Sequence, residues 1–428
     1  MSNLPLEGIR VIDHGVVYTG TAATTMLADM GAEVIRVESI SRFPAMTRGF
    51  VARPPEGLEA YPGYVDNDPG ERPWDRWWQF HAMNRNKYGI GLELSHPEGV
   101  EVYKRLVRVS DVIIENFSQG TMERLGLSYS VLKEVKPDII MISASGLGTD
   151  GPYKGYSSFG TNLDAITGMM ALRGYPGDDI ILRDLAPVWS DNVAAGTIAF
   201  AALAALHYRD KTGTGQFIDL SQAEVFLPHM GEVIMDYTMN KRIGEAIGNR
   251  EPSMAPHGCY RCRGTDRWVT ISVSSEEQWE AFCQAVGNPA WTEDDRFGNM
   301  LSRLANQDEL DKLVEEWTIK HDAYQVMHTL QGVGVSAGPV LCPSDLYNDP
   351  HLKERGFFRE VTHSEAGTHL YPGMCFKFSK TLVDIRIPPN CLGEHNEYVC
   401  REILGMTSEE IAKLEEEQVL GTEYVAEV

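Results

Sequence analysis

Short aliphatic runs alternate with longer amphipathic segments over the first 150 residues. The runs predict strands at 8–13, 33–38, 89–94, 111–116 and 138–143, and the amphipathic segments predict helices at 22–30 and 97–109. Ser95 and Glu98 have the spacing of a capping box ahead of the second helix. Strands that alternate with helices are typical of a parallel sheet covered by helices on both faces. We therefore predict an α/β fold whose large domain is doubly wound and Rossmann-like.

Residues 39–80 interrupt this alternation with six prolines and with Trp74, Trp77 and Trp78. A long insertion that carries aromatic residues is more often packed than extended as a linker. We expect a packed excursion, and a binding lid is the alternative.

The second half of the chain continues the pattern and then changes. We expect helices at 192–208 and 221–239 around a Gly-rich turn and a strand at 216–220. From residue 245 a smaller α+β domain is predicted, with strands at 267–273 and 337–341 and a helix at 276–286. The tail, with a strand at 374–379 and a helix at 408–418, is expected to return to the first sheet. The large domain would then comprise 1–244 and 346–428, and the small domain 245–345.

Composition and charge narrow the functional classes. The 428 residues are 43% hydrophobic and 23% charged, and the net charge is 38 − 61 = −23, which disfavours general binding to nucleic acid or to an acidic membrane. The N-terminus lacks the order of a signal peptide, and no run of 18 apolar residues occurs. Seven cysteines without scaffold spacing favour a reducing compartment. We expect a cytoplasmic protein without nucleic-acid or membrane partners.

Common catalytic and metal motifs are missing from the sequence. It has no Walker A loop, no HExxH, no GxSxG and no glycine fingerprint after the first strand, so a Rossmann-type dehydrogenase is disfavoured. Cys259 and Cys262 form a lone CxxC to which His257 could add one ligand. Structural zinc normally takes four ligands, so no metal site is predicted.

Several ordered motifs together resemble the class III CoA-transferases, the CaiB/BaiF-type family that includes formyl-CoA and carnitine CoA-transferases and α-methylacyl-CoA racemases. They are Asp13-His-Gly-Val-Val-Tyr-Thr-Gly20, Met26 to Glu38, Asn84-Arg-Asn-Lys87, Asp111 to Phe117, Asp191 ahead of Gly196, Lys211 to Gln216 and Gly393-Glu-His395. The resemblance implies an α/β large domain, a small α+β domain and two interlocked subunits, as a homodimer or a related heteromer. It also implies acyl-CoA and a small carboxylic acid as substrates, with no permanently bound cofactor.

The catalytic aspartate of that family matches Asp191. A carboxylate at the start of a long helix is expected to accept backbone N–H bonds at the positive end of the helix dipole and to stay ionised. An ionised carboxylate can attack a thioester, giving an aspartyl anhydride and then an aspartyl-CoA thioester. The alternative is a helix N-cap with no chemistry.

The resemblance also assigns binding residues. The positions that match CoA contacts are Tyr18, Thr19, Leu92, Glu93, Leu94, Ser95, Asn116, Phe117, Ser118 and Arg124, and Arg124 is the expected phosphate partner. Met254, His257, Gly258 and Tyr260 are expected to form a substrate lid. Two positions depart from the family pattern, since Tyr18 replaces a glutamine and Ser39 replaces a basic residue. Arg42 and Arg48 are candidates for the missing basic group.

Three functional alternatives remain. The family racemases carry His-Asp where this chain has Gly160 and Thr161, so a CoA-transferase is favoured over a racemase. An inactive partner subunit is expected to lack Asp191, but an active subunit of a heteromer stays open. The Trp-rich segment 74–78 and residues 255–262 resemble the succinyl-CoA:benzylsuccinate CoA-transferase branch, which suggests a dicarboxylate donor. Its second carboxylate would be held by Arg183, Arg250 or Arg261.

Overall fold

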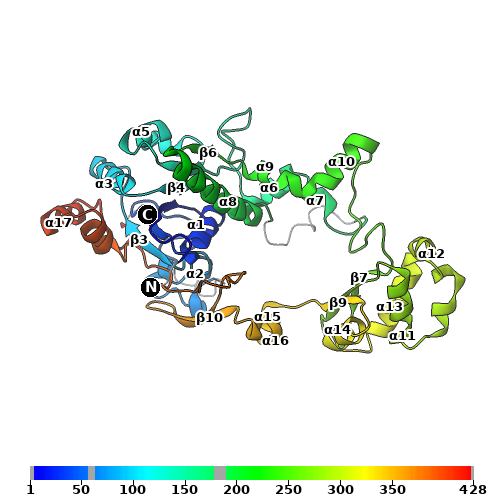
Figure 1. The fold of residues 1–428 in the computed structure, drawn as a ribbon. Coiled ribbons are helices and arrows are strands. Elements are labelled where there is room, and N and C mark those ends of the chain that lie inside the picture. The colour runs from blue at the N-terminus through cyan, green and yellow to red at the C-terminus, as the bar shows by residue number, and fades with distance from the viewer. Residues whose placement is uncertain (1–3, 56–62, 178–188, 426–428) are drawn as a thin grey trace. The chain divides into compact units, whose positions relative to one another are not determined.

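The structure is a computed structural model that describes residues 4–55, 63–177 and 189–425. The chain forms two compact units (Figure 1). The large unit comprises Met1–Met169, Ala186–Thr238 and Glu354–Val428, and the small unit comprises Met170–Leu185 and Met239–Lys353.

A six-stranded parallel sheet forms the centre of the large unit. Its order is β3-β2-β1-β4-β5-β6, with β1 at Arg10–His14, β2 at Glu33–Glu38, β3 at Lys87–Gly91, β4 at Val112–Glu115, β5 at Ile140–Ser143 and β6 at Phe217–Asp219. The chain runs outward from β1 to β3 and then returns to β4 on the other side of β1. Ligands bind at such a switch point, outside the carboxyl ends of the strands. The predicted doubly wound sheet is confirmed.

Helices cover both faces of this sheet. One face packs against α3 (Pro97–Arg108), α5 (Tyr129–Val135) and α17 (Ser408–Glu416). The other face packs against α1 (Thr19–Asp29) and α8 (Trp189–Thr212). The remaining helices of this unit are α2 (Trp78–Met83), α4 (Thr121–Arg124), α6 (Gly160–Ile166) and α9 (Gln222–Phe226), while α7 (Met169–Leu172) and α10 (Gly231–Asn240) run to the boundary of the two units.

Helix α8 is long because few of its residues disfavour a helix. Its small residues Ala195, Ala199 and Ala202 are buried and allow close packing against α1 and the sheet. Among the described residues, α8 alone is long and apolar enough to cross a membrane, and 44% of its most apolar stretch is buried. Core helices pass the same test of length and composition, so this is weak evidence for a span.

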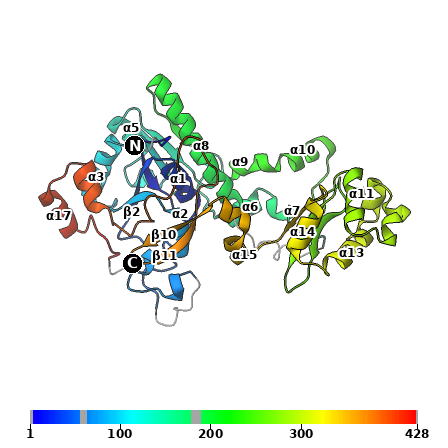
Figure 2. The ribbon, with the colours of Figure 1, turned by 60° about the horizontal axis from the view of Figure 1, so that its bottom comes forward.

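The chain after residue 354 completes the large unit. Strands β10 (Phe358–His363) and β11 (Gly367–Pro372) pair as an antiparallel hairpin, drawn in orange in Figure 2. The hydroxyl of Tyr371 in β11 lies 2.9 Å from Nδ1 of His81 in α2. Helix α17 packs its Ile411 and Leu414 into the core beside α3, so the tail does return to the first sheet.

The small unit packs helices on a three-stranded antiparallel sheet. The strand order is β7-β8-β9, with β7 at His257–Arg261, β8 at Trp268–Ser272 and β9 at Ser336–Pro339. Trp279 and Phe282 of α11 (Glu276–Ala285) and Val314 of α13 (Gln307–Thr318) fill its core. Its other helices are α12 (Met300–Ala305), α14 (Ala323–Gln331), α15 (Pro343–Asn348) and α16 (Pro350–Glu354), whose last residue begins the tail of the large unit.

Two local predictions are wrong. Helix α3 begins after His96, and Ser95 donates to the Glu93 carboxylate (2.7 Å) instead of capping the helix. The Pro97 ring at the first helical position sets where the helix begins. Residues 374–379 form no strand. Phe376 and Phe378 are exposed and lie edge to face, so their aromatic pattern reflects local packing and not strand pairing.

Candidate active site

A cavity of about 730 Å³ opens at the carboxyl ends of the parallel strands. Residues from all six strand ends reach it, because the ends of parallel strands meet at one edge of the sheet. Ten of the eleven catalytic and CoA-binding residues predicted from the sequence line it, namely Tyr18, Leu92, Glu93, Leu94, Ser95, Asn116, Phe117, Ser118, Arg124 and Asp191. The eleventh, Thr19, reaches the cavity through its hydrogen bonds to Asp191 and Gln222.

Asp191 lies in the first turn of α8, one residue after Ser190. Its Oδ1 accepts a hydrogen bond from the Thr19 hydroxyl. Its Oδ2 receives no hydrogen bond from any residue that the structure describes. Asp191 therefore has one oxygen held in place and one oxygen without a hydrogen bond from the described residues.

The backbone N–H bonds expected at Asp191 are not found among the described residues. Burial raises the pKa of its carboxyl above the ordinary aspartate value, and the hydrogen bond from Thr19 opposes this shift. The charge of Asp164 in α6 raises the pKa further. Asp164 itself accepts from the backbone N–H of Ser190 (3.1 Å). The described backbone donors at the start of α8 thus reach Asp164, and at Asp191 burial outweighs the hydrogen bond from Thr19.

The loop between β1 and α1 is fastened to the end of β4. The side chain of Asn116 accepts from the backbone N–H of Val16 (2.8 Å) and donates to its carbonyl (3.0 Å). Gly15 and Gly20 allow the close approach that this arrangement needs, since a Cβ at either position would lie under 3 Å from neighbouring atoms. Asn116 thus shapes the wall of the cavity through the backbone of the loop.

Two polar contacts beside Asp191 were not predicted. The Tyr18 hydroxyl donates to Oδ1 of Asn192 (2.6 Å), which ties the loop to α8. The buried side chain of Gln222, at the start of α9, places its Oε1 3.2 Å from the Thr19 hydroxyl. Gln222 could have been found from its place directly after the last strand of the parallel sheet, where site residues gather.

Serine side chains surround Glu93. Its carboxylate accepts from Ser39 (2.7 Å), from Ser41 and from both the hydroxyl and the backbone N–H of Ser95. Burial opposes its charge, but the hydrogen bonds outweigh burial and lower the pKa of Glu93 to about 2. Ser39 therefore helps to hold a charged carboxylate where the family has a basic residue.

Of the two arginines considered for that basic role, Arg48 is excluded. It is fully buried, and its guanidinium pairs with Glu38 (2.7 Å) and Asp75 (2.8 Å). Arg42 is exposed and lines the cavity. Arg124 also lines it, and the Arg124 guanidinium donates to Thr121 Oγ1 (2.8 Å). Arg42 and Arg124 are thus two cations that an anionic ligand in the cavity could reach.

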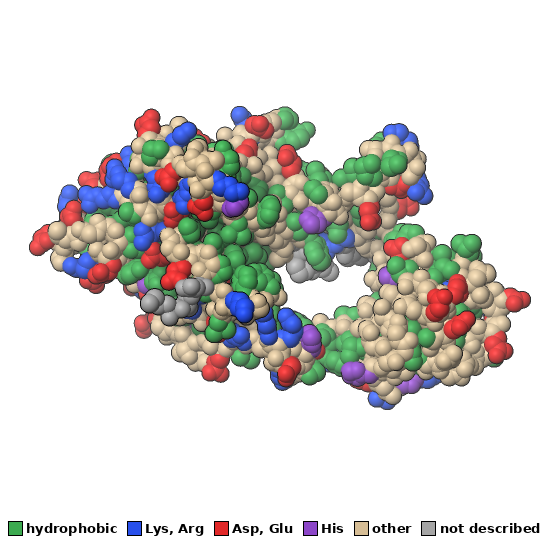
Figure 3. All heavy atoms as spheres, in the orientation of Figure 1, with side chains coloured by type: hydrophobic (Ala, Val, Ile, Leu, Met, Phe, Trp, Pro, Cys, Tyr) green, Lys and Arg blue, Asp and Glu red, His purple; other side chains and the backbone are tan. Residues whose placement is uncertain are grey.

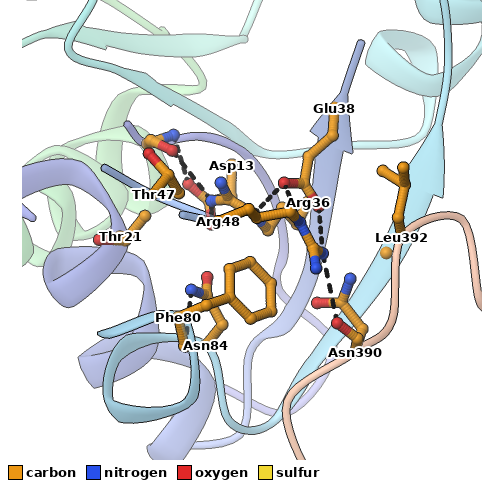
Figure 4. A network of polar contacts seen from close by, with 12 residues as sticks. Asp13, Thr21, Arg36, Glu38, Thr47, Arg48, Phe80, Asn84, Asn390 and Leu392 are labelled. Atoms are coloured by element: carbon orange, nitrogen blue, oxygen red, sulfur yellow. Dashed lines mark hydrogen bonds and ion pairs between the residues drawn. The ribbon is translucent and has the colours of Figure 1, made fainter. Parts of the chain in front are cut away.

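A network of buried charges, part of which is drawn in Figure 4, adjoins the cavity, since Arg36 and Glu38 also line it. Its cations Arg36, Arg48 and Lys87 balance the carboxylates of Asp13, Glu38 and Asp75. Arg36 also donates to the carbonyl of Gly15 (2.9 Å) in the loop that lines the cavity.

Burial and neighbouring charges shift the pKa values of this network in opposite directions. Burial opposes the charge of Glu38, but Arg36 and Arg48 outweigh it and lower its pKa to about 2. For Lys87, burial outweighs the attraction of Asp13 and lowers the pKa to about 8. Neighbouring cations also lower the pKa of Asp13, so the carboxylates of Asp13 and Glu38 are charged at neutral pH, as ion pairing requires.

The four residues predicted to form a lid lie in the small unit. Tyr260 is buried in its core, and the Tyr260 hydroxyl donates to Asp311 (2.9 Å). His257 is half-buried against Ser272, Gly258 pairs with Ile271, and Met254 is half-buried. The described part of the chain offers no group of three side chains that could hold a metal ion.

Two of the three tryptophans of the excursion are buried in aromatic packing. Trp74 is 4% exposed and packs against Tyr424, while Trp77 packs between Phe50 and Tyr64. Trp78 alone of the three is exposed. The described residues of the excursion, 39–55 and 63–80, are packed, as expected, because they carry this aromatic core.

The chain is similar in sequence to known CoA-transferases. Residues 6–396 match CoA-transferase family III. The succinyl-CoA–D-citramalate CoA-transferase of Chloroflexus aurantiacus is 32% identical, over 97% of this chain and 98% of its own. The alpha subunit of succinyl-CoA–L-malate CoA-transferase from the same species is 30% identical, over 97% and 93%. A probable CoA-transferase of Mycobacterium tuberculosis is also 32% identical over 97% of this chain, which spans only 50% of that relative.

The chain is also similar in fold to a solved structure. The crystal structure of a CaiB/BaiF family protein from Brucella suis matches with a TM-score of 0.82 and 27% identity, covering 94% of this chain and 100% of that one. The resemblance predicted from the ordered motifs is therefore confirmed: the chain belongs to CoA-transferase family III.

Proposed function

We propose that this protein transfers CoA from succinyl-CoA to a second carboxylic acid, with Asp191 as the nucleophile. The observation that carries the proposal is the state of the Asp191 carboxylate in the cavity. One oxygen is held by Thr19, and the other has no hydrogen bond from the described residues. Burial strips water from this carboxylate, which favours its attack on a thioester over its staying solvated.

The reaction is a sequence of acyl transfers on Asp191. Oδ2 attacks the thioester carbonyl carbon of succinyl-CoA, the C–S bond breaks, and the CoA thiolate leaves a succinyl–aspartyl anhydride. The thiolate then attacks the aspartyl carbonyl carbon and releases succinate, which leaves an aspartyl-CoA thioester. The acceptor carboxylate attacks this thioester and frees the thiolate again. The thiolate finally takes the acceptor acyl group and regenerates Asp191.

The names of the relatives support a dicarboxylate donor. Both C. aurantiacus proteins are named for succinyl-CoA and for hydroxylated acids with two carboxylates. Arg250 is already paired with Asp308 (2.5 Å) and Asp311 (2.8 Å), and Arg183 lies outside the described residues. Lys154 lines the cavity and is exposed. We assign the distal carboxylate to Lys154 in place of Arg250.

Racemase activity is less well supported. A racemase needs a second acid or base across the α-carbon from Asp191. Gly160, which lines the cavity at the start of α6, has no side chain to supply one.

The proposal includes a second subunit and a cytoplasmic location. Large apolar side chains of α8 lie at the surface of the large unit, among them Phe200 (70% exposed), Trp189 and Tyr208. Figure 3 shows such side chains between charged ones of both signs. Exposed apolar surface of this kind favours burial by a partner. An interlocked homodimer or a related heteromer would cover it, and the malate relative, named as an alpha subunit, supports the heteromer as the second candidate.

The test is a search for the covalent intermediate. The purified protein is incubated with succinyl-CoA, treated with hydroxylamine or borohydride, and digested for peptide mass spectrometry. A modification at Asp191 that is missing in Asp191→Asn supports the proposal. Bound succinyl-CoA without any modified residue would contradict it.

A further inference from the structure

The side chains of Thr19, Asp191 and Gln222 form a hydrogen-bonded triad in which one proton has two acceptors. The Thr19 hydroxyl is fully buried, and it donates to Oδ1 of Asp191 while Oε1 of Gln222 lies 3.2 Å away. A threonine hydroxyl has a single proton to donate. Asp191 and Gln222 therefore compete for the same donor.

The orientation of the Gln222 amide is set by the sheet. Its Nε2 donates to the carbonyl of Ala144 (2.7 Å), and its backbone N–H donates to the carbonyl of Ser145 (3.1 Å). With the NH₂ group turned to Ala144, the carbonyl oxygen must face Thr19. Gln222 thus presents an acceptor, and not a donor, to the hydroxyl that holds the nucleophile.

We propose that Gln222 is a positioning residue that accepts the hydrogen bond from the Thr19 hydroxyl when Asp191 is acylated. This inference rests on the proposed function. In the free enzyme the charged carboxylate is the stronger acceptor, because hydrogen bonds to ionised groups are stronger than neutral ones. Once Oδ2 bonds to the acyl carbon, Oδ1 becomes a neutral anhydride oxygen and a poor acceptor. The hydroxyl then turns to Gln222, so no buried donor is left unsatisfied in the intermediate.

Gln222 also weakens the hydrogen bond from Thr19 to Asp191 before the reaction. A donor that is shared with an amide oxygen stabilises the carboxylate less than an undivided one. The charged groups around Asp191 include Asp164, which raises the Asp191 pKa in the same direction as burial. The hydrogen bond from Thr19 opposes the effects of burial and of Asp164. Competition from Gln222 for this hydrogen bond therefore adjusts how strongly Thr19 stabilises the charged nucleophile.

The experiment measures acylation directly, as the burst of free CoA released by a single turnover with succinyl-CoA across a pH series. For Gln222→Met we expect acylation to be about tenfold slower, with a KM for succinyl-CoA within about threefold of wild type. The acid limb of the pH–rate profile, where the rate falls as the pH drops, should shift to lower pH. Thr19→Val should shift the acid limb to higher pH, and Thr19→Ser should restore it.

The double variant separates positioning from folding. In the Thr19→Val background, Gln222→Met should not slow acylation any further, because the hydroxyl that donates to Gln222 is already gone. Gln278→Met is the matched control, since the Gln278 amide also donates to a backbone carbonyl (Gly334, 3.0 Å), in the small unit. It should leave the burst unchanged.

Gln222→Glu covers the case in which Gln222→Met does not fold. Gln222→Glu keeps an acceptor oxygen but adds a charge that competes more strongly for the hydrogen bond from Thr19. Asp191 then loses this hydrogen bond, so the acid limb of the pH–rate profile should move to higher pH. Multiplicative effects of Thr19→Val and Gln222→Met, or an unchanged burst in Gln222→Met, would overturn the inference. No burst and no adduct in the wild-type protein would instead overturn the proposed function.

Discussion

The hydroxyl of Thr19, the first residue of α1, donates a hydrogen bond to the carboxylate of Asp191 in the first turn of α8, 172 residues further along the chain. This contact joins two helices that pack on the same face of the sheet. It places the carboxylate at the cavity and fixes which of its oxygens remains without a bond from the described chain.

Asp191→Asn should remove the nucleophile and leave the cavity intact. We expect CoA transfer from succinyl-CoA to fall by about 10³-fold or more, because no other described group stands in the same position. Since burial raises the Asp191 pKa, the charged form destabilises the fold at neutral pH, so the variant should melt at the same or a higher temperature. Transfer assays and thermal melts check both statements. Retained transfer with an unchanged fold would refute the assignment.

Acylation should fail at acid pH. The carboxylate attacks only when it is ionised, and burial raises its pKa. The burst rate should therefore fall as the pH drops, with a midpoint above the ordinary aspartate value of about 3.9. Single-turnover rates measured across a pH series locate the midpoint. A midpoint at or below the ordinary value would show that burial does not control this group.

Arg124→Ala should weaken the binding of acyl-CoA. Arg124 is exposed in the cavity, and loss of a charge-assisted bond to a phosphate costs about tenfold in affinity. We expect KM for succinyl-CoA to rise about tenfold with a smaller change in kcat. Arg105→Ala is the control, because Arg105 is also exposed but pairs with Glu410 on the far side of the sheet from α8. Equal effects of the two variants would remove Arg124 from the binding site.

Glu38→Gln should destabilise the large unit. It leaves Arg48 buried with one carboxylate fewer, and breaking a buried ion pair costs about 3–5 kcal/mol. Because the Glu38 pKa is lowered to about 2, its contribution to stability is present above about pH 5 and is lost as the pH falls toward 2. Denaturant melts at pH 7 and pH 3 test this. The loss of stability on acidification should be smaller in Glu38→Gln than in wild type.

Local patterns were sufficient to predict the elements of the large sheet. β2 spans the predicted residues, and α3 ends one residue early, because buried aliphatic runs and amphipathic periodicity are encoded in neighbouring residues. The strand predicted at 374–379 failed because alternation of aromatic residues can also arise from two rings that pack on each other. The capping box at Ser95 failed because Glu93 competes for the same hydroxyl.

The sequence by itself determined the family, the doubly wound sheet and ten of the residues that line its cavity, because strand ends and ordered motifs are local features. Only the tertiary structure decided which charges are free. It pairs Arg48 with Glu38 and leaves Arg42 exposed, and it turns Gln222 toward Thr19. Burial in the folded chain also raises the Asp191 pKa, which its position at the start of a helix does not reveal. Burial and partners from distant segments set these properties, and neither is written in the residues next to a position along the chain.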